Sequence, residues 1–230
     1  MRLVAKLLWV FGLVVVGVSG CNPVTTPPPT LKVIARDGSC NQPLEGVRLC
    51  EGDTDNCNVS GPNGEASIRL PVGEVFYTLE KEGYYSGLYQ YVMPQRDVTV
   101  SWCVGDTAEA EEFREMIGSR WPRLGTGDIQ ILMSLTPFPG ATFDLKGATG
   151  ILSYYPDEGG VDLDLEETGS SGSGDFFDVT PGEFRIEFGG TAENCGPSQS
   201  GWPSDFENSV RVLVREGYYT ILHVRCVHVP

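Results

Sequence analysis

The two histidines, His223 and His228, are the side chains best suited to ligate a catalytic metal. A zinc hydrolase needs two histidines and a carboxylate that converge on one ion and leave a position open for water. Here the histidines are five residues apart in a predicted strand, and an odd separation places them on opposite faces. We therefore expect no metal centre, and we expect His223 to face solvent with Arg225. The core-facing residues of the strand should be Leu222, Val224 and Cys226.

Other catalytic patterns are weak. The sequence has no Gly-x-Ser-x-Gly elbow, and the Gly/Ser run 169–174 is typical of a flexible loop. Acidic residues alternate with apolar ones over 161–165, which predicts a half-buried strand with a solvated acidic face rather than an acid/base pair. The calcium candidates, Asp53, Asp55 and Asn56 or Asp157 and Glu158, form no recognised loop. We predict no catalytic residue, no metal and no cofactor.

Cys21 follows a short apolar run. Arg2 and Lys6 precede LLWVFGLVVVGV, residues 7–18, which is too short to span a bilayer but suits the core of a signal peptide. The following VSGC resembles the lipobox of bacterial lipoproteins. This resemblance implies that residues 1–20 are a lipoprotein signal peptide and that Cys21 is lipidated and anchors the chain to a membrane. A plain secretory signal with a chance cysteine is the alternative.

Residues 21–30 form the expected tether. Four prolines favour extended polyproline II, at about 3.1 Å per residue, which would hold the first strand up to roughly 30 Å from the acyl chains. The residue after the cysteine is Asn22. In Gram-negative lipoproteins, which this segment resembles, aspartate after the lipidated cysteine favours retention in the inner membrane. Asparagine at this position therefore implies placement in the outer membrane. The expected location is the cell envelope, on its periplasmic or surface face.

The remaining six cysteines are an even set in a chain expected to be exported, which favours disulfides over metal or thiol chemistry. Cys50 and Cys57 flank the turn-rich segment EGDTDN, so a hairpin there would pair them. Cys40 follows the first expected strand, and Cys103 ends the last strand of the first half. A bridge between them would join the opening and closing segments of the first module. The third predicted bridge joins Cys195, in an expected inserted loop, to Cys226.

Composition excludes one partner class. The chain has 31 acidic and 16 basic residues, a formal charge of −15, and signal-peptide removal makes it more negative by two units. Such a charge repels phosphate backbones and anionic headgroups, so we expect no nucleic-acid partner.

Short alternating segments separated by turns predict an all-β fold. We expect two prealbumin-like or Ig-like antiparallel sandwich modules, over 31–104 and 126–230, with one extended sandwich as the alternative. A short helix should connect them within 105–125, because residues 106–109 resemble a capping box and Gly118 suits a C′ position. Its apolar stripe should pack on a sheet through Phe113, Met116 and Ile117.

Residues 32–85 resemble a carboxypeptidase regulatory-like, or transthyretin-like, domain. The resemblance rests on DGSCNQPLEGVRLC and on GPNGEASIRLPVGEVFYTLEKEGYY, with their Asp-Gly turn, Leu-Pro-x-Gly corner and Gly-Tyr ending. It covers about a quarter of the chain and implies a small sandwich without catalytic residues of its own.

The function expected from the sequence is a lipid-anchored envelope protein whose non-catalytic modules bind protein or organise the surface. The alternatives are a carbohydrate- or peptidoglycan-binding lipoprotein and, third, an envelope enzyme. A glycan site would need exposed rings on one face. The candidate rings are Tyr84, Tyr85, Tyr89, Tyr91, Trp121, Tyr154, Tyr155 and Trp202.

Overall fold

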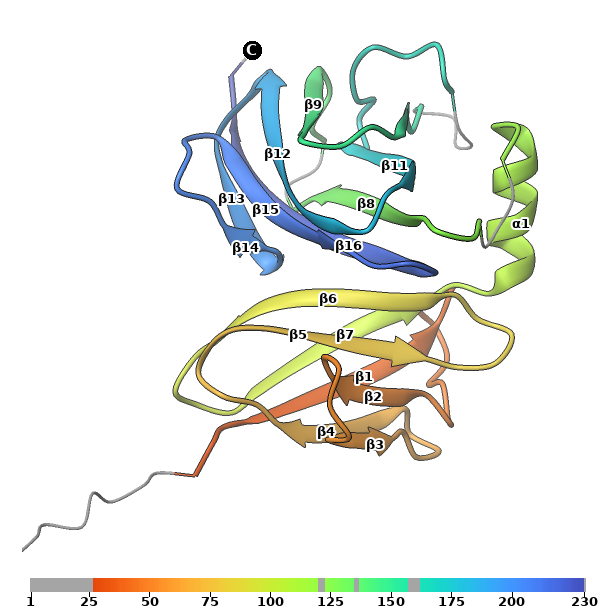
Figure 1. Cartoon of the computed structure of the whole chain (residues 1–230), viewed down its shortest axis with the longest axis vertical. Helices are drawn as coiled ribbons and strands as arrows, with labels where there is room; N and C mark the ends of the chain where they lie inside the picture. The colour runs from red at the N-terminus through yellow and green to blue at the C-terminus, as the bar shows by residue number, and fades with distance from the viewer. Residues whose placement is uncertain (1–26, 120–122, 135–136, 157–161, 230) are drawn as a thin grey trace, which may run out of the picture.

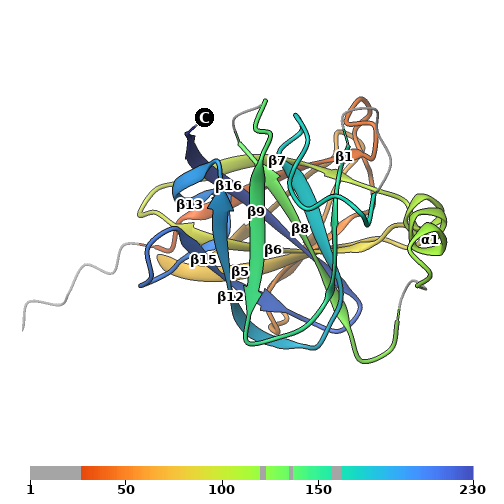
Figure 2. The same cartoon turned by 90° about the horizontal axis from the view of Figure 1, so that it is seen from above.

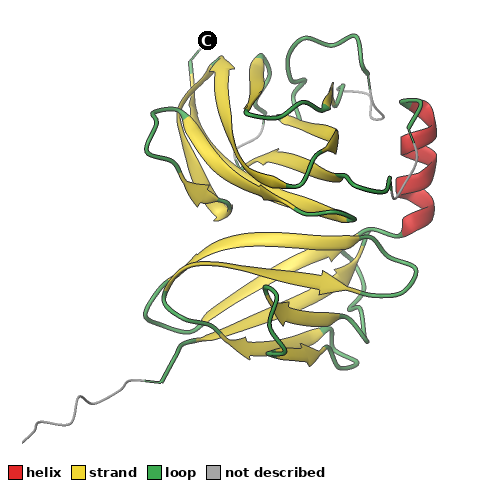
Figure 3. Cartoon of the chain, in the orientation of Figure 1, coloured by secondary structure: helices red, strands yellow, loops and turns green. Residues whose placement is uncertain are grey.

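The structure, a computed structural model, describes residues 27–119, 123–134, 137–156 and 162–229. These residues form strands and one helix, α1 (Thr107–Met116), as Figures 1 and 3 show, so the predicted all-β class is confirmed. The signal peptide and Cys21 lie outside the described residues. The strands are β1 (Thr30–Asp37), β2 (Arg48–Glu51), β3 (Cys57–Val59), β4 (Glu65–Arg69), β5 (Gly73–Glu80), β6 (Ser86–Met93), β7 (Val98–Val104), β8 (Gly127–Met133), β9 (Ala141–Lys146), β10 (Ile151–Tyr154), β11 (Ser173–Val179), β12 (Gly182–Gly190), β13 (Ala192–Ser200), β14 (Trp202–Pro203), β15 (Ser209–Val214) and β16 (Tyr218–His228).

The first half begins with the alternation seen in the sequence. Leu31, Val33 and Ala35 of β1 are buried, whereas the residues between them are partly exposed. Strand β1 pairs antiparallel with β4 and parallel with β7, in a sheet of order β4-β1-β7. The parallel pair departs from the antiparallel expectation. It arises because β1 opens and β7 closes the first half, so a long connection separates them and permits parallel pairing.

A central sheet unites the two halves of the chain. Its order is β10-β11-β8-β16-β6-β5-β2-β3, and β13 also pairs with β16. Strand β16 lies parallel to β6 of the first half and parallel to β8 of the second. The sheet therefore crosses the predicted boundary between modules, and Figure 1 shows β16 and β6 adjacent where the halves meet.

Each face of β16 serves a different core. Leu222 and Val224 belong to the core of the second half, which the sheet β14-β15-β12-β9 closes on its other side. Tyr219 and Ile221 belong to the core of the first half, together with Phe177 of β11. The molecule thus contains two sandwiches that share their middle sheet. Figure 2, seen from above, shows the strands of the second half stacked over those of the first.

Helix α1 ends as predicted but buries a different face. Gly118 has φ +71°, its N–H donates to Glu115 O (3.1 Å), and Ser119 N–H donates to Arg114 O (2.9 Å), the two bonds of a Schellman motif. Met116 is 60% exposed, so its expected packing is wrong. Arg114 is buried instead, and a residue two positions away points to the opposite side of a helix. The side chain of Phe113 lies outside the described part.

Two further expectations are wrong. The expected inserted loop around Cys195 is largely strand β13, which pairs with the C-terminal half of β16 where β6 no longer lies alongside. The expected acidic strand over 161–165 is a turn in its described part, 162–165: Asp164 N–H donates to Asp162 Oδ1 (2.9 Å) and Leu163 is exposed.

In the described ranges, no helix is long and apolar enough to cross a membrane.

Candidate functional site: a polar cluster beneath helix α1

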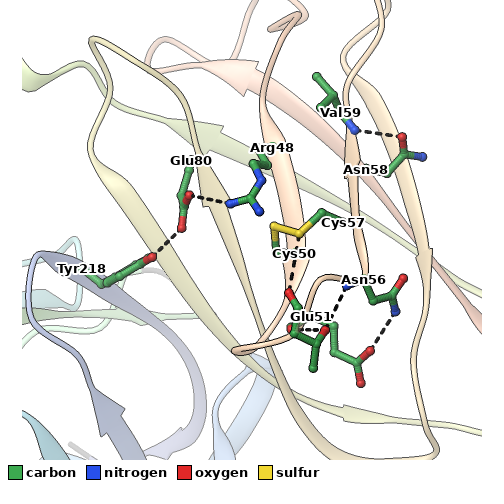
Figure 4. The surroundings of a disulfide bond; sticks show 10 residues. Arg48, Cys50, Glu51, Asn56, Cys57, Asn58, Val59, Glu80 and Tyr218 are labelled. Atoms are coloured by element: carbon green, nitrogen blue, oxygen red, sulfur yellow. Dashed lines mark hydrogen bonds and ion pairs between the residues drawn. A yellow bond between two sulfur atoms is a disulfide. The ribbon is translucent and has the colours of Figure 1, made fainter.

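Three disulfides brace the strands, and they are the same pairs that we expected from the sequence. Cys50–Cys57 links directly opposed residues of β2 and β3. Figure 4 shows it beside Arg48 and Glu80, where Glu80 also accepts a hydrogen bond from Tyr218 of the second half. Cys40–Cys103 ties the loop after β1 to the end of β7, and Cys195–Cys226 joins β13 to β16. Each bridge lies within one half of the chain.

The residues considered for calcium have other partners. Asp53 forms an ion pair with Arg215, and Asn56 donates to Glu51 Oε2 and Arg69 O, each at 2.8 Å. Asp157 and Glu158 lie outside the described residues. Over the ranges that the structure describes, no three His, Cys, Asp or Glu side chains gather as a metal site would require.

His223 does not face solvent as expected. Its ring packs 4.9 Å from that of Trp102, and its Nδ1 lies 3.0 Å from Ser200 Oγ. The prediction failed because Trp102 of the first half covers the face of β16 at His223. Ser200 is buried and its hydroxyl donates to Ile221 O (2.7 Å), so this serine–histidine pair is a cross-strand contact rather than an activated nucleophile. Arg225 and His228 are exposed.

Burial lowers the pKa of His223 to about 4, which predicts acid sensitivity. Above pH ~6.5 the His223 ring is neutral in both the folded and the unfolded chain. As pH falls towards 4, the ring is protonated in the unfolded chain but stays neutral in the folded chain. The free energy of unfolding should therefore fall by up to about 3 kcal/mol across this window. Urea denaturation from pH 7.5 to 4.5 measures it: His223→Gln should remove this loss, and the matched variant His228→Gln should retain it. Equal pH profiles for His223→Gln and the wild type would contradict the assignment.

Arg114 is the centre of a buried ionic network. Its guanidinium pairs with Asp128 and with Asp178, at 2.8 Å from Asp178 Oδ1, and lies 4.9 Å from the ring centroid of Phe177. Asp178 also binds Arg123 (2.7 Å), and its N–H donates to Asp128 Oδ1 (3.0 Å). The network fixes the helix to β8 and β11.

Burial and charge set the ionisation of these acids. Burial raises the pKa of Asp128 to about 6, although Arg114 opposes the rise, so Asp128 is ionised at neutral pH. Burial also acts to raise the pKa of Asp178, but hydrogen bonds from Arg123, Arg114 and Ser119 outweigh it and lower that pKa.

Asp175 lies on the same face of the central sheet as Asp128. It is 1% exposed, Tyr155 donates a hydrogen bond of 2.6 Å to its Oδ2, and its Oδ1 has no hydrogen-bond partner among the described residues. Burial raises the pKa of Asp175 to about 8, so the carboxyl is mostly protonated at neutral pH. Its cross-strand neighbour on β8 is Gln130.

A cavity of about 220 Å³ lies on the other side of Tyr155, which lines it, whereas Asp175 does not. Its wall includes Tyr85, Tyr155, Tyr219 and Gln130, and Asp106 with Gly105 contributes from the start of the helix. The rings of Tyr85 and Tyr219 are 5.2 Å apart. A Cβ on Gly105 would meet the Tyr85 ring at 2.3 Å, so only glycine at this position lets the ring lie there. A larger, open recess of about 580 Å³ lies by the loop after β14.

The sequence interpretation missed Arg114, Asp128, Asp175 and Asp178 as a cluster. The available signal was polar residues inside otherwise apolar strands, as in Gly-Asp-Phe-Phe-Asp over 174–178. Of the rings considered for sugar stacking, Tyr89, Tyr154 and Trp202 are buried in the fold, and Trp121 lies outside the described residues. The other four candidate rings, Tyr84, Tyr85, Tyr91 and Tyr155, are half-buried.

Comparisons with known proteins add little. No protein-family model matches the sequence, and no curated protein matches it. Solved structures that it is similar to include the Bacillus anthracis TIE protein (14% identity, 87% of this chain and 34% of that chain, TM-score 0.29). A second is the minor pilin GBS52 of Streptococcus agalactiae (14% identity, 88% of this chain and 97% of that chain, TM-score 0.27). A third is the shaft pilin SpaA of Lactobacillus rhamnosus GG (10% identity, 90% of this chain and 100% of that chain, TM-score 0.24).

The chain spans about a third of the length of the Bacillus anthracis protein. All three TM-scores are below 0.3, so no property of these proteins is carried over to this chain.

Proposed function

We propose that the chain is an exported, lipid-anchored protein of the bacterial cell envelope that acts as a non-catalytic β-scaffold. The observation that carries the proposal is the set of three disulfides across an all-β fold, since such bridges persist in oxidising compartments. The sequence around Cys21 supports anchoring through acyl chains. Residues 31–104 would be the carboxypeptidase regulatory-like module, a likeness that rests on its motifs alone.

The scaffold would present its surface to an envelope protein or organise the cell surface. Contacts between the halves suit this role because they make the folded body rigid. Trp202 Nε1 donates to Val75 O (3.0 Å), Leu213 N–H donates to Gln90 Oε1 (2.9 Å), and Arg211 pairs with Glu74. An acidic surface on a proline-rich tether would keep this body away from anionic headgroups.

Anchoring is tested by Cys21→Ala. We expect the wild-type chain to partition into detergent with the membrane fraction, because two or three acyl chains bind membranes firmly. The variant should appear in the soluble fraction or accumulate as uncleaved precursor.

The control is Asn22→Asp, which keeps the lipidated cysteine. In a Gram-negative host it should stay in the detergent phase but move to the inner membrane. Detergent partitioning of Cys21→Ala equal to that of the wild type would overturn the anchor.

A further inference from the structure

A recess of about 410 Å³ lies where the expected tether enters the fold. Its walls come from residues 27–30, the end of β4, the connection from β4 to β5 and the connection from β6 to β7. The strand register explains this placement, because Thr30 lies opposite Arg69 and Leu31 lies opposite Val98. Figure 1 shows the start of β1 and these connections at the same end of the first half.

Hydrogen bonds hold the last tether residues at this recess. Thr30 N–H donates to Asp97 Oδ1 (2.7 Å), and Leu70 N–H donates to Pro29 O (3.0 Å). Asp97 is the acid of the recess wall, and its carboxylate is engaged by this backbone bond. The direction in which the tether leaves the fold is therefore fixed from two sides.

The anchor expected at Cys21 would keep the recess close to a membrane. Six residues, 21–26, precede the first residue of the recess, Pro27, and their fully extended length is at most about 22 Å. The acyl chains on Cys21 would lie in the bilayer, directly beneath its headgroup layer. The recess is thus the part of the folded body that the tether holds next to lipid headgroups.

Two arginines of the recess have no carboxylate partner. Arg69 and Arg96 are exposed, and neither forms an ion pair within the ranges that the structure describes. The chain has 31 acidic and 16 basic residues, so partners are abundant. Arg48, Arg211 and Arg215, for example, each pair with an acid. The recess therefore presents positive charge on a strongly acidic protein, and this charge is free to bind an anion.

Exposed apolar side chains flank the arginines. Val72 lines the recess and is 56% exposed, and Val92 is 46% exposed. Val92 lies opposite Glu74 of β5, two residues after Val72, so both valines lie at the same end of the β5–β6 pair. Arginine beside exposed apolar side chains suits the boundary between headgroups and acyl chains, where the guanidinium reaches phosphate and the apolar groups leave water.

We propose that the tether-base face, made of Arg69, Val72, Val92 and Arg96, docks on the membrane that carries the chain, with its guanidinium groups on lipid phosphates. Guanidinium suits this partner because it binds phosphate in a bidentate way. The inference rests on the lipid anchor of the proposed function and adds the orientation of the anchored body. The rest of the body carries the excess of acids, which anionic headgroups repel, so charge and tether turn the same face to the membrane.

Hydrogen exchange of the lipidated chain, followed by mass spectrometry, tests the docked face. The chain is placed on vesicles with equal parts of phosphatidylglycerol and phosphatidylcholine and, for comparison, in dodecyl maltoside. We expect the backbone amides of residues 69–73 and 94–98 to exchange at least threefold more slowly on the vesicles. The loop 204–208 of the second half should exchange at the same rate in both.

Variants assign the protection to the arginines. Arg69→Gln with Arg96→Gln should lose most of it, because each arginine contributes about fivefold in affinity at an anionic surface. Arg225→Gln removes an exposed arginine of β16 and should keep it. Vesicle flotation of the same samples reports on the anchor alone. A wild-type chain that floats, but exchanges equally on vesicles and in detergent, would overturn the face and leave the anchor standing.

The soluble Cys21→Ala chain tests the face without the anchor. Dihexanoylphosphatidylglycerol, a short-chain lipid, should slow the exchange of residues 69–73 and 94–98 at least threefold more than inorganic phosphate at the same concentration, because only the lipid also contacts the valines. Equal slowing by the two would assign a free anion and overturn docking on lipid. Exchange unchanged by either would overturn the face, including in the case that the wild-type chain does not float.

Discussion

Replacing Arg114 with methionine is expected to lower the free energy of unfolding by about 3–5 kcal/mol. The reason is that Asp128, which is fully buried, would lose the guanidinium that balances its charge. The cation–π contact with Phe177 and the link between helix and sheet would be lost as well. Urea denaturation at pH 7.5 with the disulfides intact measures the change, and circular dichroism establishes that the variant folds.

The matched control is Arg123→Met. Arg123 binds the same Asp178, but its side chain is 59% exposed, and exposed ion pairs contribute about 0–1 kcal/mol. Adding Asp128→Asn to Arg114→Met should restore part of the loss, because the amide removes the unbalanced charge. Losses below about 1 kcal/mol for both single arginine variants would contradict a buried ionic centre.

The second large effect should come from the Cys40–Cys103 disulfide. The bridge joins cysteines with a sequence separation of 63, for which the chain-entropy relation gives a stabilisation of about 4 kcal/mol. For Cys50–Cys57, with a sequence separation of 7, the same relation gives about 2.5 kcal/mol. The double variant Cys40→Ala with Cys103→Ala should therefore lose more stability than Cys50→Ala with Cys57→Ala. Denaturation of both double variants beside the wild type measures the difference.

The physical reason is that a longer loop has more conformations to lose in the unfolded chain. The short bridge also joins two strands that their own register already holds together. If the double variant of the short bridge were the less stable of the two, the order predicted from loop length would be wrong.

Much of the fold was readable from local pattern. The period-two alternation in β1 predicted its buried face because a strand sends successive side chains to opposite sides. Gly118 predicted the helix end because a left-handed residue closes the Schellman motif there. The disulfide pairs followed from the position of each cysteine in its strand or turn.

The rest depends on distant parts of the chain. The parallel pairing of β16 with β6 joins residues 86–89 to residues 218–221. The local sequence of neither strand predicts which strand it pairs with. The burial of His223 follows from that pairing. Arg114 was missed because a charged residue is normally exposed, and its burial is explained only once Asp128 and Asp178 are placed beside it.

The measurement that tests the central claim most directly is the intact mass of the chain purified from membranes, taken before and after reduction. The account predicts a chain that begins at Cys21, carries the added mass of its acyl groups, and gains the mass of two hydrogens for each of three disulfides on reduction. A chain that retains residues 1–20 with an unmodified Cys21, or one whose mass does not change on reduction, would contradict an exported, lipid-anchored and disulfide-braced scaffold.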